Sequence, residues 1–222
     1  MKIVTWDTRG LGDSSKRLLL KRFLKKVNPD IVLIQETKKD RIEGSFIKSL
    51  WSSKEVGCAF VEAKGKSGGL LTVWDDSKIL VSSISKDEFS LSIKCQTINK
   101  KICWITNVYG PCDYQERRRL WAELSSLAEK LDDPWCIGGD FNSIRRRHER
   151  YPVGKATRDM NNFNKFIRLN NLLEIPLSNG QFTWSKEGDV VSKSLKMFLI
   201  IQGLQDKLEP CRSLSSYLSR SI

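Results

Sequence analysis

An acidic residue follows each of three short apolar segments in this chain, and this feature restricts the fold most strongly. The segments and their acids are Lys2–Trp6 with Asp7, Ile31–Gln35 with Glu36, and Trp135–Gly138 with Asp140. Such runs predict buried β-strands. Neighbouring buried strands deliver the residues after them to one rim of a sheet, so we expect the three carboxylates to converge there, together with Asn142. One acid at a strand end would indicate only a turn, but three in a basic chain favour a site.

The rest of the chain alternates between helical and strand-like periodicity. Apolar residues at three- and four-residue spacing predict helices between Gly10 and Pro29, over Arg41–Leu50, from Asp113 to Leu131, and around Met160–Ile167. The further strand candidates are Gly57–Val61, Leu70–Trp74, Ile79–Ile84, Phe89–Thr97, Ile102–Val108, Phe182–Trp184 and Leu195–Ile201. We therefore expect an α/β fold of one domain over residues 1–222, with two layers of mixed strands between outer helices.

The chain is strongly basic, with 38 Lys and Arg against 26 Asp and Glu and a net charge of +12. This balance favours a polyanionic partner such as DNA, although a basic surface that only aids solubility is the alternative. No apolar run of about 18 residues predicts a membrane span, and no signal-peptide pattern follows Met1. We expect an intracellular monomer of the nucleus or cytoplasm with no membrane partner.

Six cysteines and one histidine argue against a zinc site. No two cysteines form a CxxC pair, and four of them lie within or beside apolar runs: Cys58, Cys95, Cys103 and Cys136. We expect these four to be buried, reduced thiols. The single histidine, His148, has no second ligand at a zinc-binding spacing.

Carboxylates that meet at one rim form a set of oxygen donors. Mg²⁺ and Mn²⁺ prefer such hard ligands. A divalent metal held by carboxylates is suited to the hydrolysis of phosphate esters. Together with the basic charge, this donor set predicts metal-dependent hydrolysis of a phosphodiester.

Five short motifs follow one another along the chain at suitable spacing. They are Trp6–Gly10, Ile34–Thr37, Asn107–Pro111, Gly138–Asn142 and Phe182–Trp184. In combination they resemble the endonuclease/exonuclease/phosphatase superfamily, and most of all the endonuclease domain of LINE-type (non-LTR) retrotransposons of plant genomes. The resemblance extends over nearly the whole chain. It implies a DNase I-like, four-layered α/β sandwich with two central mixed β-sheets, and cleavage of DNA with a divalent metal.

The resemblance also implies roles for residues at matching motif positions. Asp7 stands where the family has asparagine, so it keeps an oxygen ligand but adds a negative charge that either tightens metal binding or repels the phosphate. By this resemblance, Glu36 and Asp7 bind Mg²⁺ or Mn²⁺. Asp140 and Asn142 handle the proton and orient the scissile phosphate. Tyr109 contacts the phosphate side of the site, and Thr183 faces the DNA.

Three positions near the C-terminus depart from the family pattern. Lys196 stands where the family has an aspartate, and Ser216 and Tyr217 stand where it has an aspartate–histidine pair. Tyrosine is neutral at pH 7 and cannot carry a proton as an imidazole does. His148 lies far upstream and does not replace the missing group. The last strand also looks shortened, which would cost stability. Because the family's catalytic groups are missing, we expect little or no catalysis.

Two runs of arginine have two interpretations each. Arg145, Arg146 and Arg147 follow the Asp140 motif and form either a solvated basic loop or a loop that contacts nucleic-acid phosphates. Arg117–Arg119 is expected to be the solvated face of a helix.

Several functions agree with these features. The first is a retrotransposon-type endonuclease with impaired catalysis, that is, a pseudoenzyme. A nucleic-acid-binding module that does not cut and a functionless gene remnant are the alternatives. The net charge and the retrotransposon-like motifs disfavour a phosphatase of the same superfamily.

Overall fold

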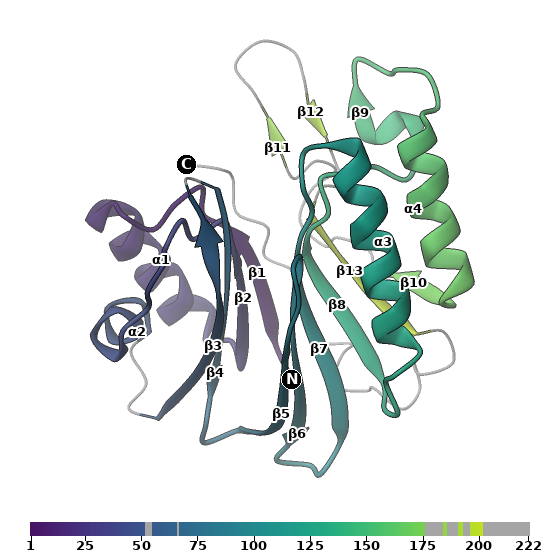
Figure 1. Ribbon diagram of the computed structural model, residues 1–222. Helices are drawn as coiled ribbons and strands as arrows, with labels where there is room; N and C mark the ends of the chain where they lie inside the picture. Colours follow the sequence, from purple (N-terminus) through teal and green to yellow (C-terminus); the bar gives the residue numbers. More distant parts are fainter. Residues whose placement is uncertain (52–54, 66, 176–183, 186–190, 193–195, 202–222) are drawn as a thin grey trace.

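Two β-sheets face one another in the centre of the molecule, and helices cover the outer face of each (Figure 1). The structure is a computed structural model that describes residues 1–51, 55–65, 67–175, 184–185, 191–192 and 196–201. The first sheet has the order β1 (Ile3–Asp7), β2 (Ile31–Gln35), β4 (Ser67–Asp75), β3 (Val56–Lys64). The second has the order β10 (Leu172–Glu174), β13 (Lys196–Ile201), β8 (Trp135–Asp140), β7 (Ile102–Tyr109), β6 (Ser90–Thr97), β5 (Ile79–Lys86).

Helices lie outside both sheets and complete a four-layered sandwich. Against the first sheet lie α1 (Ser14–Val27) and α2 (Gly44–Leu50), and against the second lie α3 (Tyr114–Ala128) and α4 (Arg158–Leu169) (Figure 1). A small third sheet, which the sequence did not predict, pairs β11 (Trp184–Ser185), β12 (Val191–Ser192) and β9 (Arg150–Tyr151). None of the helices in the described ranges is long and apolar enough to cross a membrane.

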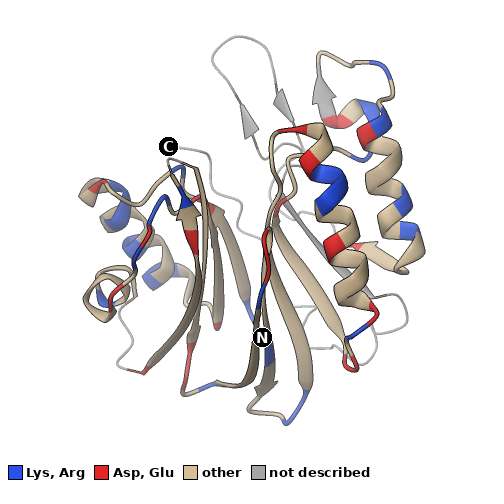
Figure 2. Cartoon of the chain, in the orientation of Figure 1, with Lys and Arg blue, Asp and Glu red and all other residues tan. Residues whose placement is uncertain are grey.

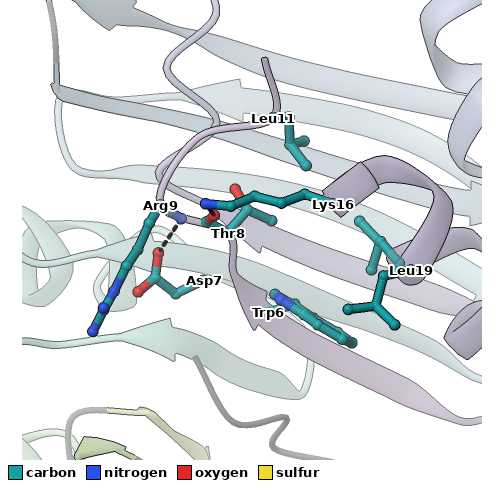
Figure 3. Close-up of a pocket in the computed structure, with 8 residues that line it drawn as sticks. Trp6, Asp7, Thr8, Arg9, Leu11, Lys16 and Leu19 are labelled. Atoms are coloured by element: carbon teal, nitrogen blue, oxygen red, sulfur yellow. Dashed lines mark hydrogen bonds between the residues drawn. The ribbon is translucent and has the colours of Figure 1, made fainter. Parts of the chain in front are cut away.

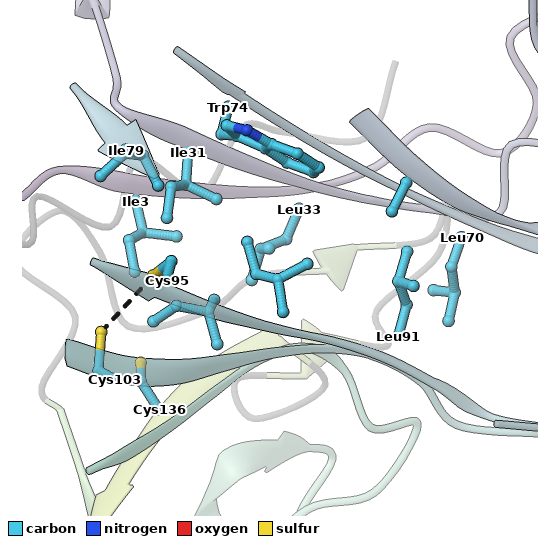
Figure 4. Close-up of a cluster of buried hydrophobic side chains, with 13 residues drawn as sticks. Ile3, Ile31, Leu33, Leu70, Trp74, Ile79, Leu91, Cys95, Cys103 and Cys136 are labelled. Atoms are coloured by element: carbon cyan, nitrogen blue, oxygen red, sulfur yellow. Dashed lines mark hydrogen bonds between the residues drawn. The ribbon is translucent and has the colours of Figure 1, made fainter. Parts of the chain in front are cut away.

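Three apolar clusters hold the four layers together. One lies between the two sheets and includes Ile3, Leu33, Leu91 and Ile105 (Figure 4). The other two fill the space between each sheet and its helices, around Leu24 and Ile34 on one side and Trp121 and Phe163 on the other. The predicted sandwich of two mixed sheets with helices outside is therefore confirmed.

Each sheet contains one pair of parallel strands, and these pairs face one another. β1 runs parallel to β2 with Asp7 opposite Gln35, and β7 runs parallel to β8 with Tyr109 opposite Asp140. Across the sandwich, β1 and β2 contact β8, and β2 also contacts β7. The carboxyl ends of four central strands therefore meet at one rim.

Two sequence-based expectations were wrong in detail. The second helix begins at Gly44 rather than Arg41, because Glu43 directly before it has an extended backbone, with φ of −97° and ψ of 158°. Cys58 is exposed rather than buried, because it lies on the edge strand β3. Cys95, Cys103 and Cys136 are buried free thiols, as expected; the Sγ atoms of Cys95 and Cys103 lie 3.7 Å apart (Figure 4).

Some expectations fall outside the described residues. They concern Phe182, Thr183, and the final strand with Ser216 and Tyr217. The predicted strand Leu195–Ile201 corresponds to β13, which lies between β10 and β8.

Candidate active site

Asp7 ends β1 with its side chain at the rim. Asp7 is 7% exposed, and its Oδ1 accepts a hydrogen bond from the backbone N–H of Arg9 at 3.2 Å (Figure 3). Arg9 and Gly10 have positive φ angles of 49° and 104°, so the chain turns sharply directly after this acid. A small cavity of about 20 Å³ beside the turn is lined by Trp6, Asp7, Thr8, Arg9, Leu11, Lys16, Leu19 and Leu20.

Glu36 follows β2 directly and adopts a left-handed backbone conformation with φ of 53°. Its carbonyl oxygen accepts hydrogen bonds from Gly10 N at 2.7 Å and from Thr8 Oγ1 at 3.1 Å. The turn that follows Asp7 is therefore tied to the backbone of Glu36. This connection fixes the two acids relative to one another.

Lys38 forms an ion pair with Glu36, a contact that the sequence alone did not place. Its Nζ lies 3.0 Å from Glu36 Oε1, and the side chains are 38% and 17% exposed. Lys38 also has a left-handed backbone, with φ of 53°, and its stem packs over Gly10. The Lys38 ammonium and the Glu36 carboxylate therefore lie side by side in the same short loop after β2.

Asp140 and Asn142 occupy the rim of the second sheet. Asp140 ends β8 and is 5% exposed, and its Oδ1 accepts from Asn142 N at 2.9 Å. The amide of Asn142 donates to the carbonyl of Gly110 at 2.6 Å, and Gly110 N donates to the Asp140 carbonyl at 2.6 Å. These contacts connect the segment after β8 to the segment after β7. A Cβ at Gly110 would lie 2.3 Å from the Phe141 carbonyl oxygen, so this close approach requires glycine.

Tyr109 ends β7 directly opposite Asp140 in the register of β7 and β8. Burial raises the pKa of its hydroxyl above the usual value of tyrosine, and the negative charges of Glu36, Asp7 and Asp140 raise it further. Burial is the largest cause that raises the pKa of the Cys112 thiol. The charges of the same three carboxylates raise it further, whereas Arg117 lowers it. Asp7, Glu36 and Asp140 stand at or directly after the carboxyl ends of strands that contact one another across the sandwich. Their roles at this rim stay a prediction.

Comparison with protein-family models identifies the family of this chain. The model of the endonuclease/exonuclease/phosphatase family matches residues 4–189. The chain belongs to this family. The match includes every motif described above except those after residue 189, so Asp7, Glu36, Tyr109, Asp140 and Asn142 all lie within it.

Solved structures of other proteins share the fold at low sequence identity. The chain is similar to the 3′ phosphatase NExo from Neisseria bound to a product DNA hairpin, with a TM-score of 0.69, 13% identity, and coverage of 92% of this chain and 88% of that one. The AP endonuclease LMAP from Leishmania major gives a TM-score of 0.64 at 15% identity, with coverage of 90% and 78%. The endonuclease domain of TRAS1, a telomere-specific non-LTR retrotransposon, gives 0.63 at 11% identity, with coverage of 91% and 86%.

The oxygen donors at this rim fit a divalent metal, but few of them come from the protein. Within the described ranges, no three His, Cys, Asp or Glu side chains are grouped closely enough to hold a metal ion. Asp7 and Glu36 nevertheless offer carboxylate oxygens at the ends of adjacent strands. Mg²⁺ keeps several waters and is often held by one or two carboxylates, so weak binding by these two residues stays a prediction.

The arginine loop divides into structural and exposed members. Arg145 NH1 lies 2.7 Å from Glu174 Oε2, and its side chain is 18% exposed. The buried Glu149 carboxylate accepts from the backbone N–H groups of Arg145 and Arg146. Arg146 and Arg147 are exposed. Contact of this loop with nucleic acid stays a prediction, and the geometry favours the last two arginines for it.

Arg117 is a structural residue that sequence reasoning assigned to a solvated face. Its guanidinium donates to the carbonyls of Pro111 and Cys112 at 2.8 and 2.6 Å and to Asp159 at 3.0 Å. It thereby fixes the loop that follows Tyr109. A run of three arginines contains no signal that separates this residue from its neighbours, because the contact depends on how α3 packs on α4.

Proposed function

We propose that this chain is a divalent-metal-dependent DNA endonuclease domain of the retrotransposon type, with impaired catalysis. One observation carries the proposal: Asp7, Glu36 and Asp140 stand at or directly after the carboxyl ends of β1, β2 and β8, and these strands contact one another across the sandwich. Carboxylates at one rim of a basic chain suit a metal-assisted reaction on a polyanion. The similarity in fold to TRAS1 and to a DNA-bound phosphatase is consistent with this reaction class.

In this proposal, the residues at the rim have different roles. Asp7 and Glu36 would hold the metal, which would stabilise negative charge on the phosphate when bound. The Tyr109 hydroxyl is protonated at neutral pH, as tyrosine ordinarily is, so it can donate a hydrogen bond to a phosphate oxygen. Asp140, oriented by the backbone of Asn142, can accept a proton from an attacking water.

The impairment rests on residues that the family pattern leads us to expect and that this chain lacks. Lys196 stands in place of an aspartate and is opposite Asp140 in the register of β13 and β8. Ser216 and Tyr217 stand in place of an aspartate–histidine pair. Loss of a general acid–base group costs about 10²–10⁴ in rate, and members of one catalytic unit do not act additively. We therefore propose a rate roughly two orders or more below that of a competent relative.

Basic residues supply the proposed affinity for DNA. Figure 2 shows Lys and Arg on all four helices, which agrees with the net charge of +12. Arg146 and Arg147 are exposed directly after the Asp140 motif, and Thr183 remains a proposed DNA-facing residue. Because phosphate contacts do not require catalysis, a binding module that does not cut is the second candidate function. We further propose that residues 1–222 act as one monomeric domain in the nucleus or cytoplasm.

A plasmid-nicking assay tests the proposed function. We expect slow nicking that requires Mg²⁺ or Mn²⁺ and is abolished by Glu36→Gln. The triple variant Lys196→Asp, Ser216→Asp, Tyr217→His should nick faster if it folds. No nicking by either protein, with intact salt-dependent DNA binding, would favour the binding module. Robust nicking by the unmodified protein would contradict the proposed impairment.

A further inference from the structure

Two buried amide side chains meet between the sheets, in a layer that is otherwise largely apolar. Gln35 from β2 and Asn107 from β7 are both 0% exposed. Gln35 Nε2 donates to Asn107 Oδ1 at 2.6 Å. Next to them on the same inner surfaces lie Leu33 and Ile105, which belong to the inter-sheet cluster drawn in Figure 4. The amide pair therefore replaces apolar packing at one end of this layer.

Asn107 also binds the backbone of the opposite sheet. Its Nδ2 donates to the carbonyls of Ile34 and Leu71, each at 3.2 Å. Gln35 Nε2 lies 2.9 Å from the hydroxyl of the buried Thr5 in β1. Asn107 of the second sheet thus contacts β2 and β4 of the first sheet, and its partner Gln35 is hydrogen-bonded to β1. Hydrogen bonds have a short range and a preferred direction, so they fix a position that apolar contacts would leave free to slide.

The pair lies directly below the candidate site. Gln35 immediately precedes Glu36, and Asn107 lies two residues before Tyr109 on the same face of β7. A shift of the two sheets at this point would move Glu36 relative to Tyr109. Buried hydrogen bonds add only modest net stability, because each amide gives up its water. Their main effect here is therefore on geometry.

We propose that Gln35 and Asn107 are a positioning pair that sets the separation between the Glu36 rim of the first sheet and the Tyr109–Asp140 rim of the second. This inference rests on the proposed function for its use in metal and phosphate binding. The geometric part is independent of any metal. Neither residue touches the substrate in this scheme.

A spin-label distance measurement tests the geometric part without metal or DNA. Nitroxides are attached at Lys38→Cys, after β2, and at the native exposed Cys112, after β7, with Cys58 and Cys211 changed to serine. The test variant is Gln35→Leu/Asn107→Leu, which removes both polar partners and leaves neither amide unpaired. We expect a distance distribution between the labels that is shifted or clearly broader than in the parent.

Thr106→Val is the matched control. Thr106 is buried in β7 beside Asn107, but it bonds to Ser92 and Trp135 of its own sheet. It should lower the melting temperature and leave the distance distribution unchanged. An unchanged distribution in the Gln35/Asn107 double variant would overturn the inference.

Mn²⁺ affinity, measured by electron paramagnetic resonance on chains with native Lys38, links the pair to the site. Loss of a residue that orients metal ligands costs about 10–100-fold in affinity, so we expect a weakening of about 10-fold in the double variant and none in Thr106→Val. Equal affinity in the double variant and the wild type would overturn the link to the site. If the wild type shows no Mn²⁺ binding that depends on Glu36 while the label distance still changes, the proposed function fails and the positioning role stands.

Discussion

We predict that Lys38 competes with a divalent metal for the carboxylate of Glu36. Its ammonium lies 3.0 Å from Glu36 Oε1, in the loop that also contains the candidate ligand. A divalent cation that binds Glu36 must share or displace this contact. We therefore predict that Lys38→Met strengthens the binding of Mn²⁺ or Mg²⁺, since methionine keeps an unbranched stem that can pack over Gly10 but has no charge.

The size of the effect follows from the geometry of the pair. Two unit charges 3.0 Å apart interact by about 1.4 kcal/mol in bulk water and by about 5.5 kcal/mol at an effective dielectric constant near 20. The Lys38 side chain is 38% exposed, so solvent screening and lost side-chain freedom reduce the net contribution to about 1 kcal/mol or less. That value corresponds to a gain in metal affinity of about five-fold.

Calorimetric titration with Mn²⁺ measures the change, and Lys39→Met is the matched control. Lys39 is the next residue and carries the same charge, but its ammonium lies over the Phe46 ring, 5.7 Å from the centroid. The long-range effect of a lost charge is similar in both variants, so the difference between them reports the contact with Glu36. Equal affinities in Lys38→Met and Lys39→Met, or weaker binding in Lys38→Met, would refute the competition.

The other measurable consequences concern DNA affinity, alkaline stability and one tight backbone contact. Arg146→Ala/Arg147→Ala should reduce the slope of log affinity against log salt by about 2, and an unchanged slope would contradict phosphate contact by this loop. Because the pKa of Tyr109 is raised in the folded state, the unfolded chain loses this proton first, and stability falls as pH rises above about 10. Tyr109→Phe should make that fall shallower in urea unfolding; equal curves would show that the hydroxyl does not contribute. Gly139→Ala should cost about 3 kcal/mol, since φ is 151° and a Cβ would lie 2.0 Å from a backbone carbonyl of β7, whereas Gly154→Ala, with open space around it, should cost far less.

The acids at the rim could be predicted from the sequence, and the contacts between them could not. Apolar runs identify buried strands, and the residue after a strand is fixed by the chain itself, so Asp7, Glu36 and Asp140 were accessible to sequence reasoning. Gln35 and Asn107 lie 72 residues apart and meet across two sheets. Strand periodicity shows which residues face inward, but it does not show which strand of the other sheet lies opposite.

Lys38 and Cys58 illustrate the same limit at shorter range. The ion pair of Lys38 with Glu36 depends on two left-handed backbone conformations at residues that are not glycine, which sequence rarely reveals. Cys58 lies in an apolar run, yet it is exposed, because β3 is the edge strand of its sheet. Burial there is decided by strand order rather than by composition.

The position of β13 has a consequence for the order in which the domain can form. β13 lies between β8 and β10 and is antiparallel to both, although it follows them in the sequence. A nascent chain that has emerged only as far as β10 would have β8 unpaired on one side, with the backbone groups of the strand that ends on Asp140 open to solvent. Open strand edges pair readily with other chains. Association of such incomplete chains during synthesis would therefore begin at the same strand that carries an acid of the candidate site.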